Sequence, residues 1–124
     1  MYNGKKVLIV DDSSVERHLL SQITKDLGFE IFLAESGEDG IVKAMECRPD
    51  LILMDVVMLG MNGFQATKKI TTTEELKNTP VIMCTSKGQA TDRIWGQRQG
   101  AKAYVIKPVN KEELINEIKK LLGK

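Results

Sequence analysis

Five short segments rich in apolar residues, each followed by a helical pattern, constrain this chain more than any other feature. They cover residues 7–10, 30–34, 50–55, 80–86 and 103–108. A run of branched apolar residues without alternation is typical of a strand buried on both faces of a parallel sheet. The alternation with helices therefore predicts an α/β protein, in which helices cover both faces of a five-stranded parallel sheet.

Capping residues indicate where the helices begin. Ser13 and Glu16 form the pattern of a capping box, and Gly28 suits the left-handed residue that ends a helix. The stripe expected to face the core from this first helix consists of Val15, Leu19, Ile23 and Leu27. Three later helices are expected to begin after the capping residues Ser36, Asn62 and Asn110. A further helix with a weaker pattern is expected over residues 89–99. The whole pattern predicts a single domain, 1–124, with no output domain.

The composition excludes several classes of protein. Apolar residues make up 42% and charged residues 28% of the chain, as in a globular domain. The net charge of +1, with no element rich in Lys and Arg, argues against nucleic acid as a partner. No apolar run approaches the roughly 20 residues of a membrane span. Cys47 and Cys84 lack the spacing of a metal site, so we expect structural thiols in a cytoplasmic protein that binds no membrane.

The carboxyl ends of the predicted strands carry the candidate functional residues. In an open α/β sheet, ligands bind at these ends, where the strand order reverses. The polar residues and the proline found there are Asp11, Asp12, Asp55, Thr85, Ser86, Lys107 and Pro108. In a flavodoxin-like, doubly wound (βα)5 sandwich with strand order 2-1-3-4-5, the first and third strands are neighbours. Asp11, Asp12 and Asp55 should then converge.

Three converging carboxylates need a counter-charge. At about 5 Å and an effective dielectric constant near 20, each like-charged pair costs roughly 3 kcal/mol. A hard divalent cation removes this cost, and Mg²⁺ suits a site that water and a phosphate complete. We expect Asp12 and Asp55 to bind the ion directly and Asp11 to act through water. The backbone carbonyl of Val57 is a further candidate ligand.

Lys107 and Thr85 indicate phosphate chemistry. An ammonium and a hydroxyl facing the acids can hold the oxygens of a phosphoryl group. The nucleophile would be a carboxylate, and Asp55 is the best candidate because it stands alone. Each residue also has a plainer interpretation: Asp12 as a helix N-cap, Asp55 as a loop acid and Thr85 as a strand former. Their shared position at one edge of the sheet favours a functional site.

Together these residues resemble a known family. The Asp pair at 11–12, Asp55 in LILMDVVM, Thr85 in MCTS and the KP pair at 107–108 are similar to the motifs of the receiver domain of response regulators. The resemblance covers essentially the whole chain. It implies that a histidine kinase transfers a phosphoryl group from a phosphohistidine to Asp55, with Mg²⁺ bound at Asp11, Asp12 and Asp55.

The resemblance also implies how the protein switches. Thr85 and Lys107 would hold the phosphoryl group, and the peptide between residues 107 and 108 would be cis. Tyr104 matches the aromatic switch residue, whose ring follows Thr85 when phosphorylation draws Thr85 inward. Lys87, Trp95 and Tyr104 are then expected on the output surface, where a downstream motility or signalling protein binds. We expect a monomer or weak dimer.

Within the family, GFQATKK and WGQRQGAKAYVIKPV resemble single-domain regulators of the type IV pilus, chemotaxis-like pathway, which control twitching motility. The chain departs from the common pattern at three positions. Leu59 stands where many receivers have Pro, Val57 replaces a residue that is often polar, and Lys87 is basic where the chemotaxis regulator has an acid. The lifetime of the phosphorylated state therefore stays open.

Two alternative functions remain. The first is an interaction module of receiver fold that works without phosphorylation, although the complete set of acids, hydroxyl and lysine argues against it. The second is a Mg²⁺-dependent phosphohydrolase. The sequence has no phosphate-binding glycine loop of the Walker or dinucleotide type and no insertion large enough for a substrate pocket. We therefore expect no enzyme, but a regulator that assists only its own phosphorylation and dephosphorylation.

Overall fold

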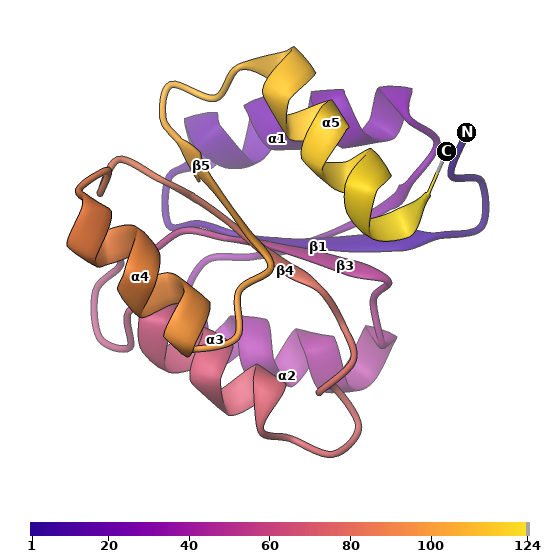
Figure 1. Cartoon of the computed structure of the whole chain (residues 1–124). Coiled ribbons are helices and arrows are strands. Elements are labelled where there is room, and N and C mark those ends of the chain that lie inside the picture. The colour runs from indigo at the N-terminus through magenta and orange to yellow at the C-terminus, as the bar shows by residue number, and fades with distance from the viewer. Residues whose placement is uncertain (124) are drawn as a thin grey trace.

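The strands form one parallel sheet in the predicted order (Figure 1). The computed structural model describes residues 1–123. Its strands are β1 (Lys6–Val10), β2 (Glu30–Ala34), β3 (Leu51–Met54), β4 (Val81–Thr85) and β5 (Ala103–Ile106). The sheet order is β2-β1-β3-β4-β5, and every neighbouring pair is parallel. The predicted doubly wound α/β sandwich is confirmed.

Helices cover both faces of the sheet (Figure 1). One face carries α1 (Ser14–Asp26) and α5 (Lys111–Leu122). The other carries α2 (Gly37–Cys47), α3 (Gly63–Thr71) and α4 (Ala90–Arg98). None of the helices within residues 1–123 is long and apolar enough to cross a membrane.

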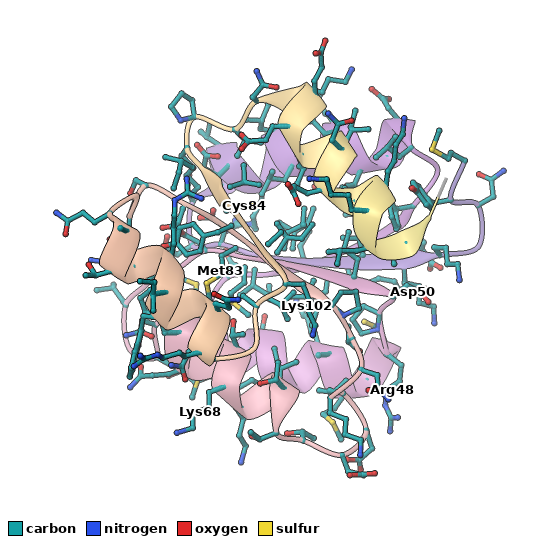
Figure 2. All side chains as sticks on the ribbon, in the orientation of Figure 1. Arg48, Asp50, Lys68, Met83, Cys84 and Lys102 are labelled. Carbon is teal, nitrogen blue, oxygen red and sulfur yellow. The ribbon has the colours of Figure 1, made fainter. Side chains whose placement is uncertain are left out.

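The central strands are buried because each contributes side chains to both faces of the sheet. On β1, Ile9 packs with α1 and α5, whereas Leu8 packs with α2 and α3. On β4, Cys84 lies on the side of α1 and α5, and Met83 lies on the side of α4 (Figure 2). This arrangement explains the apolar runs without alternation in the sequence.

The core-facing stripe of α1 shares Ile23 and Leu27 with the predicted stripe, but not Val15 and Leu19. Val15 is 74% exposed and Leu19 is also exposed, whereas Leu20, Ile23 and Thr24 are buried. The Thr24 hydroxyl donates to the Leu20 carbonyl at 2.8 Å, so this polar side chain is satisfied inside the core. The prediction for Val15 and Leu19 was therefore wrong, because a buried threonine shifts the core-facing stripe.

The helix caps use the predicted residues. Three side chains accept a hydrogen bond from the backbone N–H three residues later: Ser13, Ser36 and Asn110. Asn62 and Gln65 form a complete capping box, with both hydrogen bonds at 2.9 Å. At α1 only the Ser13 half of the predicted box is present. The Oε2 atom of Glu16 is buried there and has no hydrogen-bond partner among the described residues.

Gly63 allows α3 to begin against the loop that follows β3. Its N–H donates to the Val56 carbonyl at 2.9 Å. A Cβ at this position would lie 1.9 Å from the Asp55 carbonyl oxygen and 2.8 Å from the Val56 Cα. Side-chain rotation cannot relieve this overlap, because both neighbours are backbone atoms. The close approach therefore restrains the peptide that carries Asp55.

We expect Gly63→Ala to lower the free energy of unfolding by about 3 kcal/mol, near the upper end of the usual cost of overpacking. The matched control is Gly88→Ala, whose Cβ would meet the flexible end of Ile106 at 3.3 Å. Urea unfolding of both variants measures the difference. Equal midpoints for the two variants would contradict the prediction.

Candidate functional site

The pairing of β1 with β3 brings Asp11 and Asp55 together. Val10 and Met54 are paired residues, and the Asp55 N–H donates to the Val10 carbonyl at 2.9 Å. The acids that follow these residues therefore lie side by side. Together with Asp12 they form an acid cluster, in which one carboxylate oxygen from each residue lies within 4.8 Å of the others. Asp11 is 1% exposed and Asp55 is 6% exposed, whereas Asp12 faces solvent.

Lys107 brings a positive charge to the acid cluster. Its Nζ lies 2.8 Å from Asp11 Oδ2 and 3.5 Å from Asp55 Oδ2. Burial by itself lowers the pKa of Lys107, but the hydrogen bond to Asp11 and the charges of Asp55 and Asp11 outweigh burial and raise this pKa. Lys107 is therefore charged at neutral pH. The peptide between Lys107 and Pro108 is cis, as the resemblance implied.

The fold disfavours the charged form of Asp55. Burial raises the pKa of Asp55, and the charge of Asp11 raises it further. Lys107, the Val56 N–H and the Thr85 hydroxyl oppose this rise without cancelling it. The Val56 N–H donates to Asp55 Oδ1 at 2.8 Å, so the Oδ2 atom is the one that faces Lys107. A further positive charge at this site would stabilise the carboxylate.

Thr85 connects the acid cluster to Tyr104 through the loop between β4 and α4. Thr85 is fully buried at the end of β4. Its Oγ1 accepts a hydrogen bond from the Lys87 N–H at 3.3 Å. The Lys87 carbonyl in turn accepts one from the Tyr104 hydroxyl at 2.7 Å. A displacement of Thr85 would therefore act on both Lys87 and Tyr104.

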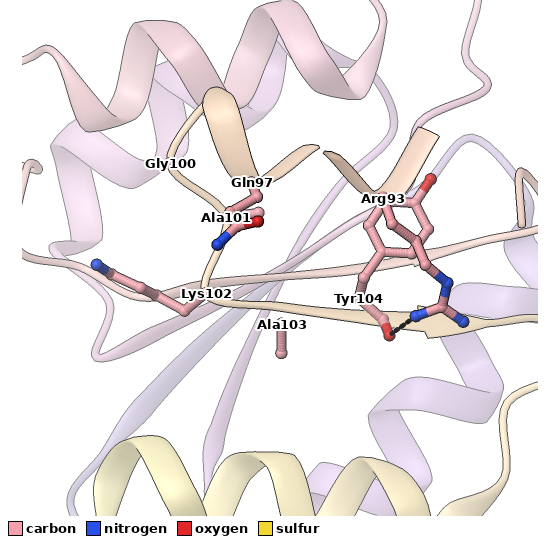
Figure 3. Close-up of a pocket in the computed structure, with 7 residues that line it drawn as sticks. All are labelled: Arg93, Gln97, Gly100, Ala101, Lys102, Ala103 and Tyr104. Atoms are coloured by element: carbon pink, nitrogen blue, oxygen red, sulfur yellow. Dashed lines mark hydrogen bonds between the residues drawn. The ribbon is translucent and has the colours of Figure 1, made fainter. Parts of the chain in front are cut away.

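The Tyr104 side chain lies beside α4 and lines a cavity of about 360 Å³ (Figure 3). The Arg93 guanidinium lies 5.5 Å from the ring centre, and its Nη1 donates to the Tyr104 carbonyl at 3.5 Å. Burial, followed by the charge of Asp92, raises the pKa of Tyr104 to about 12. The hydroxyl therefore stays protonated at neutral pH. Gly96 leaves room for the ring, since a Cβ there would lie 3.0 Å from the ring atom Cε2.

Lys87 and Trp95 lie at the surface near the site. Both side chains are exposed, and with Val57 they line a cavity of about 460 Å³. The Lys87 Nζ lies 3.8 Å from Asp92 Oδ1. Tyr104 is half-buried by comparison. The assignment of Lys87, Trp95 and Tyr104 to an output surface stays a prediction.

The donor set of the acid cluster fits a hard divalent cation. Its three carboxylates offer the oxygen ligands that Mg²⁺ prefers, with one member open to solvent where waters can complete the shell. A cation also relieves the repulsion between the two buried acids. The Val57 carbonyl as a ligand stays a prediction. The structure thus brings together every charged residue expected at the site.

Arg17 contacts the acid cluster, although the sequence motifs did not predict this. This residue lies in the first turns of α1, and its Nη1 donates to the Asp11 carbonyl at 2.7 Å. Its spacing from Leu20 and Thr24, three and seven positions later, places all three on one helix face, but the sequence pattern did not indicate that Leu20 and Thr24 are buried. A charged residue on a buried helix face needs a partner, and here the partner belongs to the acid cluster.

A family model described as the response regulator receiver domain matches residues 7–119. The chain belongs to this family. The match begins in β1 and ends in α5, so it includes all the residues of the acid cluster together with Thr85, Tyr104 and Lys107. The resemblance seen in the sequence motifs is therefore confirmed.

Relatives and solved structures agree with the family match. The protein PilH of Pseudomonas aeruginosa is 45% identical over 118 residues, which are 95% of this chain and 98% of PilH. The structure of chemotaxis protein CheY4 from Vibrio cholerae has a TM-score of 0.89 at 34% identity and covers 95% of this chain and 98% of its own. A chain of the CheX–CheY–BeF3–Mg²⁺ complex from Borrelia burgdorferi has a TM-score of 0.91 at 28% identity, with 98% and 92% covered.

In the absence of Mg²⁺, we expect Asp55→Asn to raise the free energy of unfolding at pH 7 by on the order of 1 kcal/mol, because the variant removes a buried charge that Asp11 repels. The pKa of Asp55 in the folded protein lies above its ordinary value of 3.8, so wild-type stability falls as the pH rises through the folded-state pKa. The advantage of the variant should therefore be full above that pKa and disappear as the pH falls towards 3.8.

Urea unfolding in EDTA between pH 4 and pH 7 measures this difference. An Asn variant that is equally or less stable than wild type at pH 7 would contradict the electrostatic account of Asp55. Asp39→Asn is the control, since Asp39 is a surface acid whose partner is Lys43 on the same helix.

Proposed function

We propose that this receiver domain is a stand-alone response regulator of a two-component phosphorelay, with residues 1–124 as one domain. It accepts a phosphoryl group on Asp55 from a histidine kinase, with Mg²⁺ bound at the acid cluster. Phosphorylation then changes which partners it binds. The observation that carries the proposal is the cluster of Asp11, Asp12 and Asp55 beside Lys107, in a chain that belongs to the receiver family.

The proposed transfer is a displacement at phosphorus. An oxygen of Asp55 forms the new O–P bond, the P–N bond to the kinase histidine breaks, and the electron pair stays on the imidazole nitrogen, which takes up a proton. Because Oδ1 of Asp55 accepts the Val56 N–H, Oδ2 is the proposed nucleophile. Bound Mg²⁺ would supply positive charge to the phosphoryl oxygens.

Lys107 and Thr85 would hold the phosphoryl group after transfer. The Lys107 ammonium already lies 3.5 Å from Asp55 Oδ2. It can therefore form a charge-assisted hydrogen bond to an oxygen of a phosphoryl group attached to that atom. Bound Mg²⁺ would replace Lys107 as the partner of the Asp11 carboxylate. The Thr85 hydroxyl, at the end of the neighbouring strand β4, is the proposed donor to a second phosphoryl oxygen.

The hydrogen bonds of the β4–α4 loop support a route from Asp55 to the output surface. If the Thr85 hydroxyl turns towards a phosphoryl group, it gives up its contact with the Lys87 N–H. The loop can then shift, and the Tyr104 ring can follow, since its hydroxyl is bound to the Lys87 carbonyl. Such a movement changes the surface formed by Lys87, Trp95 and Tyr104.

The proposed setting is the cytoplasm, in a pathway of type IV pilus, twitching motility or chemotaxis-like signalling. The similarity to PilH over nearly the full length of both chains supports a small regulator of this kind. The similarity to a chain of the CheX–CheY–BeF3–Mg²⁺ complex supports a regulator that works with Mg²⁺ and a protein partner. The proposed partners are a histidine kinase and a downstream motility or signalling protein, with the regulator a monomer or weak dimer.

We expect the protein to gain the mass of one phosphoryl group when it is incubated with a small-molecule phosphodonor and Mg²⁺. The gain should be absent in EDTA, because the cation relieves the repulsion that an incoming phosphoryl group would meet at the acid cluster. It should also be absent in Asp55→Asn. Intact mass spectrometry measures all three cases, and Asp39→Asn, which changes a partly exposed acid of α2, controls for general loss of a carboxylate.

A gain that persists in Asp55→Asn would identify a different acceptor. No gain in the wild-type protein, with Mg²⁺ binding measured separately, would leave two possibilities: a phosphorylation-independent module or a strict need for the kinase. Incubation with candidate phosphorylated kinases then separates them, because only the second predicts transfer.

A further inference from the structure

Arg17 bridges the loop after β1 and the residue after β2. Its Nη1 donates to the Asp11 carbonyl at 2.7 Å, and its Nη2 lies 3.3 Å from Glu35 Oε1. The Arg17 side chain is 12% exposed, whereas that of Glu35 is 79% exposed. The guanidinium is thus largely withdrawn from water, and the contact it makes in the interior is with a backbone atom of the acid cluster.

The turn at Asp11 is held from several directions. The Asp11 N–H donates to the Ala34 carbonyl at 3.1 Å, and Asp11 Oδ1 accepts the Ser13 N–H at 2.9 Å. Arg17 adds the third restraint, on the carbonyl oxygen. That carbonyl belongs to the peptide that joins Asp11 to Asp12, so its orientation sets where the Asp12 side chain begins.

Asp12 depends on this peptide more than its neighbours do. Its carboxylate faces solvent and makes no hydrogen bond or ion pair among the described residues, whereas Asp11 and Asp55 are buried and hydrogen-bonded. The backbone therefore sets where the Asp12 side chain begins, and no contact with another described residue holds its carboxylate in place. A residue that fixes this backbone also fixes how well the acid cluster can surround a cation.

We propose that Arg17 is a positioning residue for the metal site. It holds the Asp11–Asp12 peptide in the orientation that lets both carboxylates serve one divalent cation, and Glu35 steadies the guanidinium from the solvent side. This inference rests on the proposed function, because it requires that the acid cluster binds Mg²⁺.

The sign of the effect on Mg²⁺ affinity separates positioning from charge. A positive guanidinium near a cation site repels the cation, so by charge alone the removal of Arg17 should tighten Mg²⁺ binding. Positioning requires the opposite result. Arg17→Lys keeps the charge, and its single ammonium lacks the planar fork that reaches two acceptors at once. By charge alone this variant should bind Mg²⁺ as wild type does.

The experiment is isothermal titration calorimetry with Mg²⁺ on the wild-type protein, Arg17→Met and Arg17→Lys. We expect the Kd to rise about tenfold in Arg17→Met, the lower end of the effect of removing a residue that orients metal ligands. A smaller rise in the same direction is expected for Arg17→Lys. Urea unfolding in EDTA reports whether each variant is folded at the temperature of the titration.

Lys43→Met is the matched control. Lys43 has the same pattern of contacts as Arg17, since its Nζ donates to the Leu33 carbonyl at 2.5 Å and lies 3.2 Å from Asp39 Oδ2. It belongs to α2, outside the acid cluster, so its removal should leave the Kd unchanged.

Tighter or unchanged Mg²⁺ binding in Arg17→Met overturns the proposal. If Arg17→Met does not fold, Arg17→Lys decides alone, and an unchanged Kd in that variant overturns the proposal. A wild-type protein that binds no Mg²⁺ would overturn both this inference and the metal site of the proposed function. A wild-type protein that binds Mg²⁺ and variants that bind equally well would overturn this inference only.

Discussion

The mutual repulsion of carboxylates at the ends of β1 and β3 is the constraint on which the site depends. Parallel pairing of these strands places Asp11 beside Asp55, and both acids are buried. Burial raises the pKa of Asp55 above its ordinary value, the repulsion by Asp11 raises it further, and Lys107 and the Val56 N–H offset only part of this rise. The fold therefore holds a site whose electrostatic balance is incomplete. In the proposed function, a cation and then a phosphoryl group act on this imbalance, which gives both ligands a way to change the protein.

The backbone around the acids is restrained as well as their side chains, through Gly63 and Arg17. Gly63 brings the start of α3 against the carbonyl of Asp55, and Arg17 holds the carbonyl of Asp11. Both contacts act on the peptide that carries an acid. A glycine and an arginine outside the acid cluster therefore restrain the backbone from which the carboxylates of the cluster extend. The site is thus a property of two loop conformations, to which the carboxylates are attached.

The sheet order and the meeting of the acids could be predicted, because both follow from local patterns: apolar runs, and polar residues at strand ends. The face that α1 turns to the core could not, since Thr24 is buried through a hydrogen bond to its own helix and shifts the stripe. Arg17 was also missed. Its partner is a backbone carbonyl, which exists at every position and leaves no mark in a sequence. The link from Thr85 to Tyr104 likewise passes through the backbone of Lys87.

The shallow packing of α4 against the sheet means that its surface can change at little cost in stability. Within Ala90–Arg98 Gly96 is the one buried residue, while Ile94 and Trp95 are exposed. Substitutions on this helix remove little buried apolar surface, so their cost in folding free energy is small. If the proposed output surface includes α4, gene duplicates of such a domain can acquire new partners through this helix while the acid cluster and the sheet stay unchanged. A pathway with several similar regulators can arise in this way, because each copy keeps the same stable fold.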